Sequence, residues 1–264
     1  LSVLVICKFN KRPKTKPMQL YPIESGNFKL DGGAMFGVVP KSLWQRTNPA
    51  DANNMIDIAA RCLLIEDGKR LILIDTGMGD KQNDKFFGYY YLWGTDSIDN
   101  SLKQLGFHRD DITDVFMTHL HFDHCGGSVQ WNKERTGYEP AFKNAHFWSN
   151  REHWQWATRS NNREKASFLK ENILPMIPLI KYQEKTIAFM ADLLPTVGHL
   201  PLPFVMGYDT RPLLTLDEKE LFLNKAADEH LYLFLEHDAH NQIITVKHTE
   251  KGVRLDKNYT TKDI

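Results

Sequence analysis

Apolar runs alternate along the chain with amphipathic stretches, and this alternation predicts an α/β protein. Two apolar runs, 60–66 and 70–74, flank Asp67-Gly68-Lys69, a sequence typical of the turn between two antiparallel strands. Residues 96–105 carry apolar side chains at helical spacing, and Gly106 is a helix stop. We therefore expect a β-hairpin followed by a helix in this part of the chain.

The alternation continues to the end of the chain. Strands are expected at 115–117, 145–148, 186–191 and 231–235, and helices at 150–158, 161–177 and 215–230. Thr215-Leu216-Asp217-Glu218 has the pattern of a capping box, so we expect the last helix to open there. No linker or internal repeat interrupts the pattern. It fits two mixed β-sheets sandwiched between helices.

Length and charge narrow the class of protein. The chain has 264 residues, enough for a large core, and its 33 basic and 33 acidic residues cancel. This balance argues against a nucleic-acid-binding surface. Three cysteines at unrelated spacings imply no disulfide framework and favour a reducing, cytoplasmic location. We interpret 1–17 as an N-terminal extension or leader, with a truncated export signal as the alternative, and 18–264 as one domain.

The strongest chemical signal is the sequence His119-Leu120-His121-Phe122-Asp123-His124, which follows the expected strand 115–117. On an extended backbone, alternate side chains point the same way, so His119 and His121 can bind one ion while Asp123 and His124 reach a second. An isolated histidine is more often an ordinary core or surface residue. Four such groups at this spacing favour a metal site, because imidazole and carboxylate are ligands that suit zinc. If these polar groups were buried without a metal, nothing would compensate for their loss of hydration.

Two later strands also end in residues of ligand type. The run 186–191 leads to Asp192, and the run 231–235 leads to His237. Strand ends are where rigid scaffolds present functional groups. Each residue alone would be read as an ordinary polar loop residue, and so would Asp75 after the run 70–74. Cys125, beside the histidine cluster, is a weaker candidate for a ligand or nucleophile.

These motifs resemble the metallo-β-lactamase fold of metallohydrolases. The resemblance rests on H-x-H-x-D-H after a strand and on Ile74-Asp75-Thr76-Gly77 at the end of an earlier strand, and it covers about 19–255. The segment 30–37, with Val39-Pro40 and Leu43-Trp44, is similar to the branch of N-acyl-homoserine lactone lactonases and methyl parathion hydrolases. The fold that the resemblance implies is a four-layer αββα sandwich with two mixed sheets.

The resemblance also implies a chemistry. Asp192 corresponds to a carboxylate that bridges two divalent ions, zinc first and manganese, iron or cobalt next, and His237 corresponds to the last histidine of the second site. A metal-bound hydroxide would attack a small lactone, ester or organophosphate. Asp123 and Asp192 would orient this nucleophile, Asp192 would carry a proton, and Asp75 would accept from a ligand histidine. The expected partner is a small-molecule substrate, with no nucleic acid or membrane; a homodimer is also compatible.

The chain departs from the family's pattern at one place. The family carries another ligand histidine shortly before the strand of the bridging aspartate, yet no histidine lies between Trp156 and Asp192. Either that loop was lost, or a segment is omitted near the Glu184–Lys185 bond, which predicts a chain break there. Two other functions stay open: an iron-dependent oxidoreductase, although diiron members carry glutamate at the position of His121, and a non-catalytic scaffold.

Overall fold

The computed structural model describes residues 18–136, 138–149, 153, 157, 179–182, 185–209 and 211–264. The expected extension 1–17 lies outside the described residues. The chain divides into two compact units. Unit 1 contains Lys29–Ala59 and the described residues of Met176–Ile264, and unit 2 contains the described residues of Lys11–Phe28 and Ala60–Pro175. The first sheet's two longest strands contribute residues to both units.

Unit 2 is built on this first sheet, which has five strands in the order β1-β2-β3-β4-β7. The strands are β1 (Gln19–Asp31), β2 (Met55–Asp67), β3 (Arg70–Ile74), β4 (Asp114–Phe116) and β7 (His146–Trp148). The sheet is mixed, since β2 and β3 are antiparallel whereas β3, β4 and β7 are parallel. The carboxyl ends of these three parallel strands therefore lie at one edge, where the histidine-rich loop begins.

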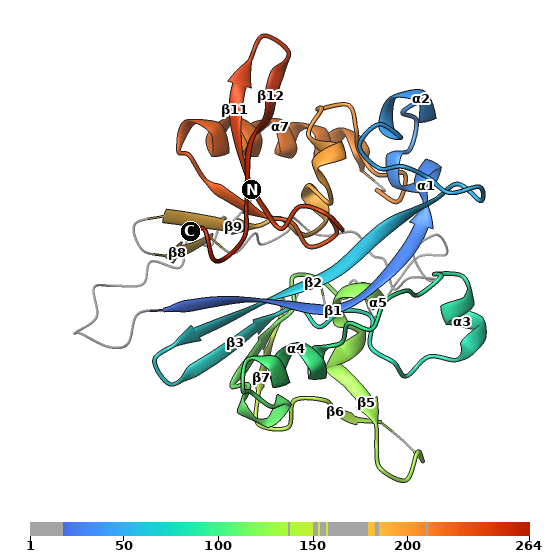
Figure 1. The fold of residues 1–264 in the computed structure, drawn as a ribbon, viewed down its shortest axis with the longest axis vertical. Helices are drawn as coiled ribbons and strands as arrows, with labels where there is room; N and C mark the ends of the chain where they lie inside the picture. Colours follow the sequence, from blue (N-terminus) through green and yellow to red (C-terminus); the bar gives the residue numbers. More distant parts are fainter. Residues whose placement is uncertain are drawn as a thin grey trace. The chain divides into compact units, whose positions relative to one another are not determined.

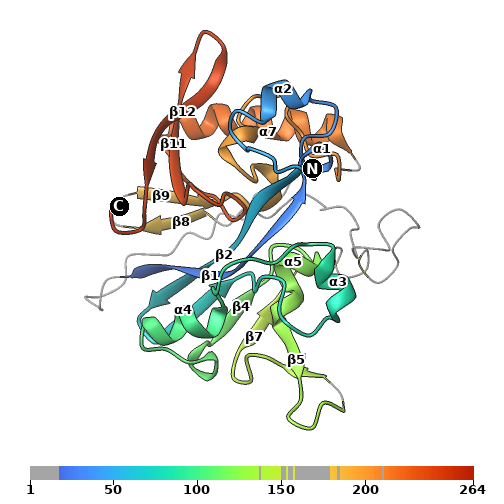
Figure 2. The same ribbon diagram turned by 45° about the vertical axis from the view of Figure 1, so that its right-hand side comes forward.

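Short helices and a small hairpin complete unit 2. They are α3 (Asp84–Gly88), α4 (Ile98–Gln104), η1 (Arg109–Asp111), α5 (Phe122–Cys125), η2 (Gly126–Ser128), β5 (Val129–Trp131) and β6 (Tyr138–Pro140). Helix α4 covers one face of the sheet (Figure 2) and buries Ile98 and Leu102 against Leu73 and Val115. This apolar cluster fixes the sheet behind the loop that follows β4.

Unit 1 is built on a second mixed sheet, with the order β12-β11-β10-β9-β8. Its strands are β8 (Leu179–Tyr182), β9 (Lys185–Phe189), β10 (Tyr232–Phe234), β11 (Ile243–Thr249) and β12 (Gly252–Tyr259). Its helices are α1 (Gly32–Phe36), α2 (Lys41–Trp44), η3 (Ala191–Leu193), η4 (Val197–His199) and α7 (Pro212–Asp228). Helix α7 lies beside β11 (Figure 1) and packs Phe222 and Leu223 in one core with Ile244.

The expected alternation and the two mixed sheets are confirmed. The hairpin is formed by β2 and β3, with Asp67 opposite Arg70, and β2 begins earlier than expected. Helix α4 starts after Ser97, whose side chain accepts from Asn100 N and caps the helix. The prediction that a capping box at Thr215 opens the last helix is wrong. Helix α7 already begins at Pro212, a residue favoured in a first turn, and the Thr215 hydroxyl donates to Asp209.

Some expectations fall outside the described residues. The helices expected at 150–158 and 161–177 are described only at His153 and Ala157. Glu184, where a chain break was expected, also lies outside, but β8 and β9 pair antiparallel with Tyr182 opposite Lys185. Among the helices that the structure describes, none combines the length and the apolar character that a bilayer crossing needs.

Gly126 and Gly127 let two loops of unit 2 touch through their backbones. A Cβ on Gly126 would lie 2.1 Å from the carbonyl oxygen of Met78, and a Cβ on Gly127 would lie 2.1 Å from that of Thr76. Gly127 N donates to Gly77 O across the same contact, at 3.0 Å. Neither glycine has a positive φ, so close approach, and not an unusual turn, requires them.

We predict that Gly126→Ala destabilises the metal-free protein by about 2 kcal/mol or more, because the added methyl group overlaps backbone that cannot rotate away. Gly88→Ala is the control. A Cβ there meets nothing within 4 Å, so stability should stay unchanged or rise by up to about 1 kcal/mol. Urea unfolding of both variants measures the difference. Equal stabilities would contradict the close-approach explanation.

Candidate metal centre

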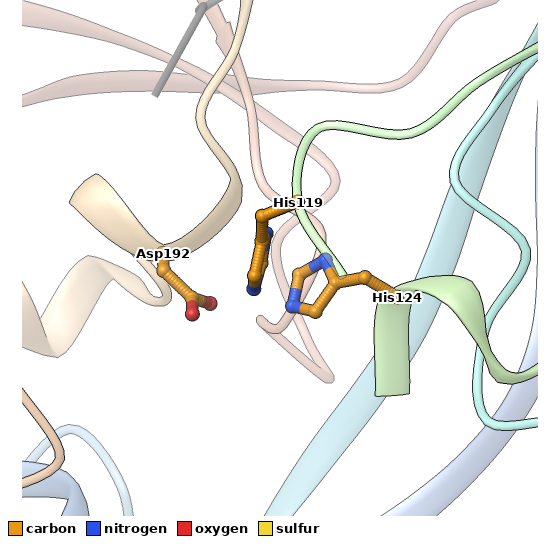
Figure 3. Close-up of side chains that lie close together, drawn as sticks. All are labelled: His119, His124 and Asp192. Atoms are coloured by element: carbon orange, nitrogen blue, oxygen red, sulfur yellow. The ribbon is translucent and has the colours of Figure 1, made fainter. Parts of the chain in front are cut away.

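Three histidines of unit 2 gather in the loop after β4. The ring of His119 lies 4.0 Å from that of His121 and 3.8 Å from that of His124, measured between centroids. The rings of His121 and His124 are 6.1 Å apart. Figure 3 draws His119 and His124, together with Asp192 of unit 1. Three imidazoles this close form a donor set suited to zinc and its borderline neighbours.

A buried carboxylate organises this cluster. Asp75 follows β3, has no exposed surface, and adopts a φ of 58°, in the left-handed region. Its Oδ1 accepts from Thr118 N at 2.8 Å. Its Oδ2 accepts from the Thr118 hydroxyl at 2.6 Å and lies 3.0 Å from Nδ1 of His124. Asp75 therefore supports the loop through its backbone and orients a candidate ligand.

These bonds also set which ring nitrogen can bind a metal. Because Asp75 is an acceptor, Nδ1 of His124 carries the hydrogen and Nε2 presents its lone pair. The Thr118 hydroxyl gives its hydrogen to Asp75, so its oxygen accepts from Nδ1 of His119, 3.1 Å away. His119 thus also presents a lone pair on Nε2. Partners of this kind fix the tautomer of metal-binding histidines.

Asp123, the last group of the motif, and Cys125, which directly follows the motif, have different surroundings. Asp123 lies beside the cluster, with Oδ2 3.9 Å from Nε2 of His124. Desolvation raises the pKa of the Cys125 thiol to about 11, against the opposing effects of His124 and Lys81. A neutral thiol is a poor ligand and nucleophile, which agrees with the weaker interpretation of Cys125.

His153 contacts the same loop from the segment after β7. Its Nε2 lies 2.9 Å from the backbone nitrogen of Leu120, which donates to it. The side chain is 3% exposed, and its ring is edge-on to His119 with centroids 6.4 Å apart. Burial, with a smaller effect of His119, lowers the pKa of His153 to about 4, so the ring is neutral at pH 7.

Unit 1 holds a second cluster, formed by Asp192 and His237. Asp192 lies in η3 and His237 follows β10, and Nε2 of His237 is 3.0 Å from Oδ1 of Asp192. Nδ1 of His237 donates to the carbonyl oxygen of Ala59, also at 3.0 Å. A neutral His237 therefore turns a lone pair toward a carboxylate, and two acceptors at this distance need a shared cation. A metal ion or a proton satisfies both atoms.

The loop that carries His237 is fixed by its neighbour Asp238. One carboxylate oxygen of Asp238 accepts from Val197 N at 2.8 Å, and the other accepts from His240 N at 2.9 Å. His237 also accepts from Ala59 N through its carbonyl oxygen at 3.3 Å. Unit 1 thus holds this histidine between β2 and the first residue of η4.

His199 belongs to the core of unit 1 and is not a ligand in this cluster. Its ring stacks on Phe36 with centroids 4.2 Å apart, and Phe36 stacks in turn on Trp44 at 5.2 Å. Nε2 of His199 donates to Met35 O at 3.0 Å, and Nδ1 accepts from the Thr196 hydroxyl at 2.9 Å. Phe36 and Trp44, which belong to the segments 30–37 and Leu43-Trp44 of the family resemblance, are therefore packed in the core of unit 1.

The structure brings the six expected site residues together in two groups. His119, His121, Asp123 and His124 cluster in unit 2, and Asp192 and His237 pair in unit 1. Sequence reasoning missed the roles of Thr118, Ala59 and His153. Thr118 directly precedes the motif and could have been suspected. Ala59 acts through its own backbone, and the imidazole of His153 accepts from the backbone of Leu120; contacts to backbone atoms leave no signal in the sequence.

The fold and these clusters define a known class of protein. The family model of the metallo-β-lactamase superfamily matches residues 57–203, more than half of the chain, and the chain belongs to this family. The matched range includes the histidine motif and Asp192.

Individual relatives agree with this assignment. An N-acyl homoserine lactonase of Bacillus thuringiensis is 30% identical over 138 residues, which are 47% of this chain and 51% of the relative. The chain thus spans about half the length of that relative, and 69% of a Bacillus sp. lactonase that is 30% identical over 190 residues.

Solved structures share the fold over nearly the whole chain. A probable metal-dependent hydrolase from Staphylococcus aureus has a TM-score of 0.80 at 25% identity, covering 93% of this chain and 98% of that one. AidC, a dizinc quorum-quenching lactonase, has a TM-score of 0.75 at 20% identity, covering 95% and 97%.

We predict that Asp75→Asn weakens both the fold and metal binding, because the new amide group faces donors where an acceptor is needed. The metal-free protein should lose about 1–3 kcal/mol, and metal affinity should fall about 10- to 100-fold. Urea unfolding and competition with a chromophoric chelator measure the two effects. Asp110→Asn, at an exposed position of unit 2, is the control and should change neither.

We predict that His199 makes unit 1 sensitive to acid. Burial is the main cause that lowers the pKa of His199 from 6.5 to about 3. Between these values the unfolded chain binds a proton that the folded chain does not. Stability therefore falls as the pH drops from 6.5 toward 3, by at most about 1.4 kcal/mol per pH unit.

Urea unfolding of the metal-free protein between pH 7 and 4 tests this expectation. His199→Gln cannot titrate, so its stability should depend less on pH than that of the wild type. His146→Gln, at an exposed position of β7, should keep the wild-type slope. Parallel slopes for the wild type and His199→Gln would show that another group causes the acid sensitivity.

Proposed function

We propose that the protein is a dinuclear metal-dependent hydrolase whose substrate is a small lactone or a related ester. The ligands are His119, His121, Asp123 and His124 of unit 2 and Asp192 and His237 of unit 1. Five of them, all except His121, also belong to groups of potential metal ligands among the described residues. The observation that carries the proposal is the set of Nε2 lone pairs of His119, His124 and His237, each fixed by a hydrogen bond at Nδ1.

The donor set fits two divalent ions, of which zinc is the first choice. In the proposed site His119 and His121 would hold one ion, Asp123, His124 and His237 would hold the other, and Asp192 would contribute to both. The 3.0 Å separation of Asp192 and His237 supports the bridging role, since a carboxylate and an imidazole lone pair at this distance could bind the same ion. Bound ions of this kind act as Lewis acids and make water a nucleophile near neutral pH.

The chain's own residues supply proton transfer and orientation. In lactone hydrolysis, water adds to the carbonyl carbon, the ring C–O bond breaks, and the departing oxygen gains a proton. Asp192 accepts the proton of the attacking water at Oδ and returns it to the departing oxygen. Asp123 orients the water through a hydrogen bond.

The substrate class rests on the relatives. The Bacillus thuringiensis and Bacillus sp. proteins are named N-acyl homoserine lactonases, and AidC is named a quorum-quenching lactonase. The formal charge of zero agrees with a neutral or weakly charged small molecule. Phosphotriesters and aryl esters are the other substrates of this chemistry that the branch resemblance includes.

One observation favours a second candidate, a metal-binding scaffold without turnover. No histidine occurs between Trp156 and Asp192, and β8 pairs directly with β9. Two histidines and a shared carboxylate would then hold the first ion, less firmly than three histidines and that carboxylate would. Metal content measured on the purified protein, two ions against one, separates the dinuclear enzyme from this scaffold.

We predict that Asp192→Asn lowers kcat for lactone hydrolysis by about 100-fold or more, because it removes a proton acceptor and the bridging charge together. The assay is a panel of acyl-homoserine lactones, aryl esters and phosphotriesters, followed by pH-stat with zinc-loaded protein. Asp217→Asn, at an exposed position of α7 in the same unit, is the matched control and should keep full activity.

Two outcomes would contradict this mechanism. Full activity of Asp192→Asn would show that the carboxylate carries no step. Undiminished turnover after chelation, with loss of metal verified by elemental analysis, would show that the reaction needs no ion. Either result would favour the scaffold or another site.

A further inference from the structure

The backbone between β4 and α5 lies outside the sheets and helices, apart from a hydrogen bond from Met117 N to the carbonyl oxygen of Trp148 in β7. Residues 117–121 belong to neither kind of element, although they carry His119 and His121. Backbone amides in such a segment must find partners elsewhere when they are buried. The two amides on either side of His119 are both held by buried side chains. Thr118 N donates to Asp75 at 2.8 Å, and Leu120 N donates to His153 at 2.9 Å.

The geometry of the second bond defines the state of His153. Because Leu120 N is the donor, Nε2 of His153 is the acceptor and its hydrogen is on Nδ1. The side chain is 3% exposed, so this bond is shielded from water. Leu120 is the residue between His119 and His121. A bond to its amide therefore fixes the backbone at the midpoint of the H-x-H pair.

We propose that His153 is a positioning residue that holds the H-x-H segment in its metal-binding conformation by accepting the Leu120 amide hydrogen. This inference rests on the proposed function, because it concerns the same metal site. His153 is no ligand in this proposal; it acts through the backbone of two ligands. Its support matters more here than it would beside three histidines, since the chain has no histidine between Trp156 and Asp192.

Zinc affinity of His153 variants tests the inference without any substrate. His153→Met fills similar space with only a very weak acceptor, and it should lower the affinity for the weaker of two zinc ions about 10- to 100-fold in competition with a chelator. His153→Gln can place Oε1 near the position of Nε2 and should stay within about threefold of the wild type. His146→Met, at an exposed position of unit 2, is the control and should match the wild type.

The outcomes separate this inference from the proposed function. Wild-type affinity in His153→Met would overturn the positioning role, whatever the activity. Zinc binding that is weakened in His153→Met and retained in His153→Gln would support the positioning role. If the wild-type protein then hydrolysed none of the substrates, that result would contradict only the proposed hydrolase function. Equal losses in His153→Met and His153→Gln would mean that packing, and not the accepted hydrogen bond, matters.

A measurement on the wild-type protein covers the case in which His153→Met fails to fold. An N–H···N hydrogen bond transmits a scalar coupling between the two nitrogen atoms. In protein labelled with ¹⁵N and ²H, we expect a coupling between the Leu120 amide nitrogen and Nε2 of His153, with the ring hydrogen on Nδ1. A ring with its hydrogen on Nε2 would overturn the proposal, since that nitrogen could not accept.

Discussion

The buried carboxylate of Asp75 is the group on which the unit 2 cluster depends. A carboxylate without exposed surface is costly unless its oxygens accept hydrogen bonds, and Asp75 accepts from Thr118 twice and from His124 once. The same bonds that stabilise the charge fix the tautomers of two histidines. Stability and ligand orientation therefore share one set of contacts. A substitution that removes the hydrogen bonds of Asp75 would therefore change both stability and ligand orientation. These bonds couple the loop after β3 to the loop after β4.

Sequence patterns predicted the candidate ligand residues of the site better than the hydrogen bonds that hold those residues in place. The H-x-H-x-D-H motif identified His119, His121, Asp123 and His124, because ligand spacing on an extended backbone is a local property. Ile74-Asp75-Thr76-Gly77 likewise indicated Asp75. The link from His237 to Ala59 O joins residues 178 positions apart, through a carbonyl group that every residue carries. No pattern in the chain could single it out.

Errors in the predicted elements have the same origin. The hairpin of β2 and β3 and helix α4 were predictable from turn residues and apolar spacing. The capping box at Thr215 was wrong because Asp209, six residues earlier, accepts from both Thr215 and Arg211 N and so starts the helix sooner. The tryptophans near His153 in the sequence, Trp148, Trp154 and Trp156, favour a packing role for this histidine. Its contact with Leu120 is a tertiary feature, invisible in helical spacing.

The order of the two units along the chain has a consequence for how the protein is made. Unit 2 is complete by Pro175, whereas unit 1 joins Lys29–Ala59 to the part that begins at Met176. During synthesis on the ribosome, Ala59 can contact His237 only after the last third of the chain has emerged. Closing so long a loop is slow and entropically costly. We therefore expect nascent chains to acquire the histidine cluster of unit 2 well before Asp192 and His237 are in place.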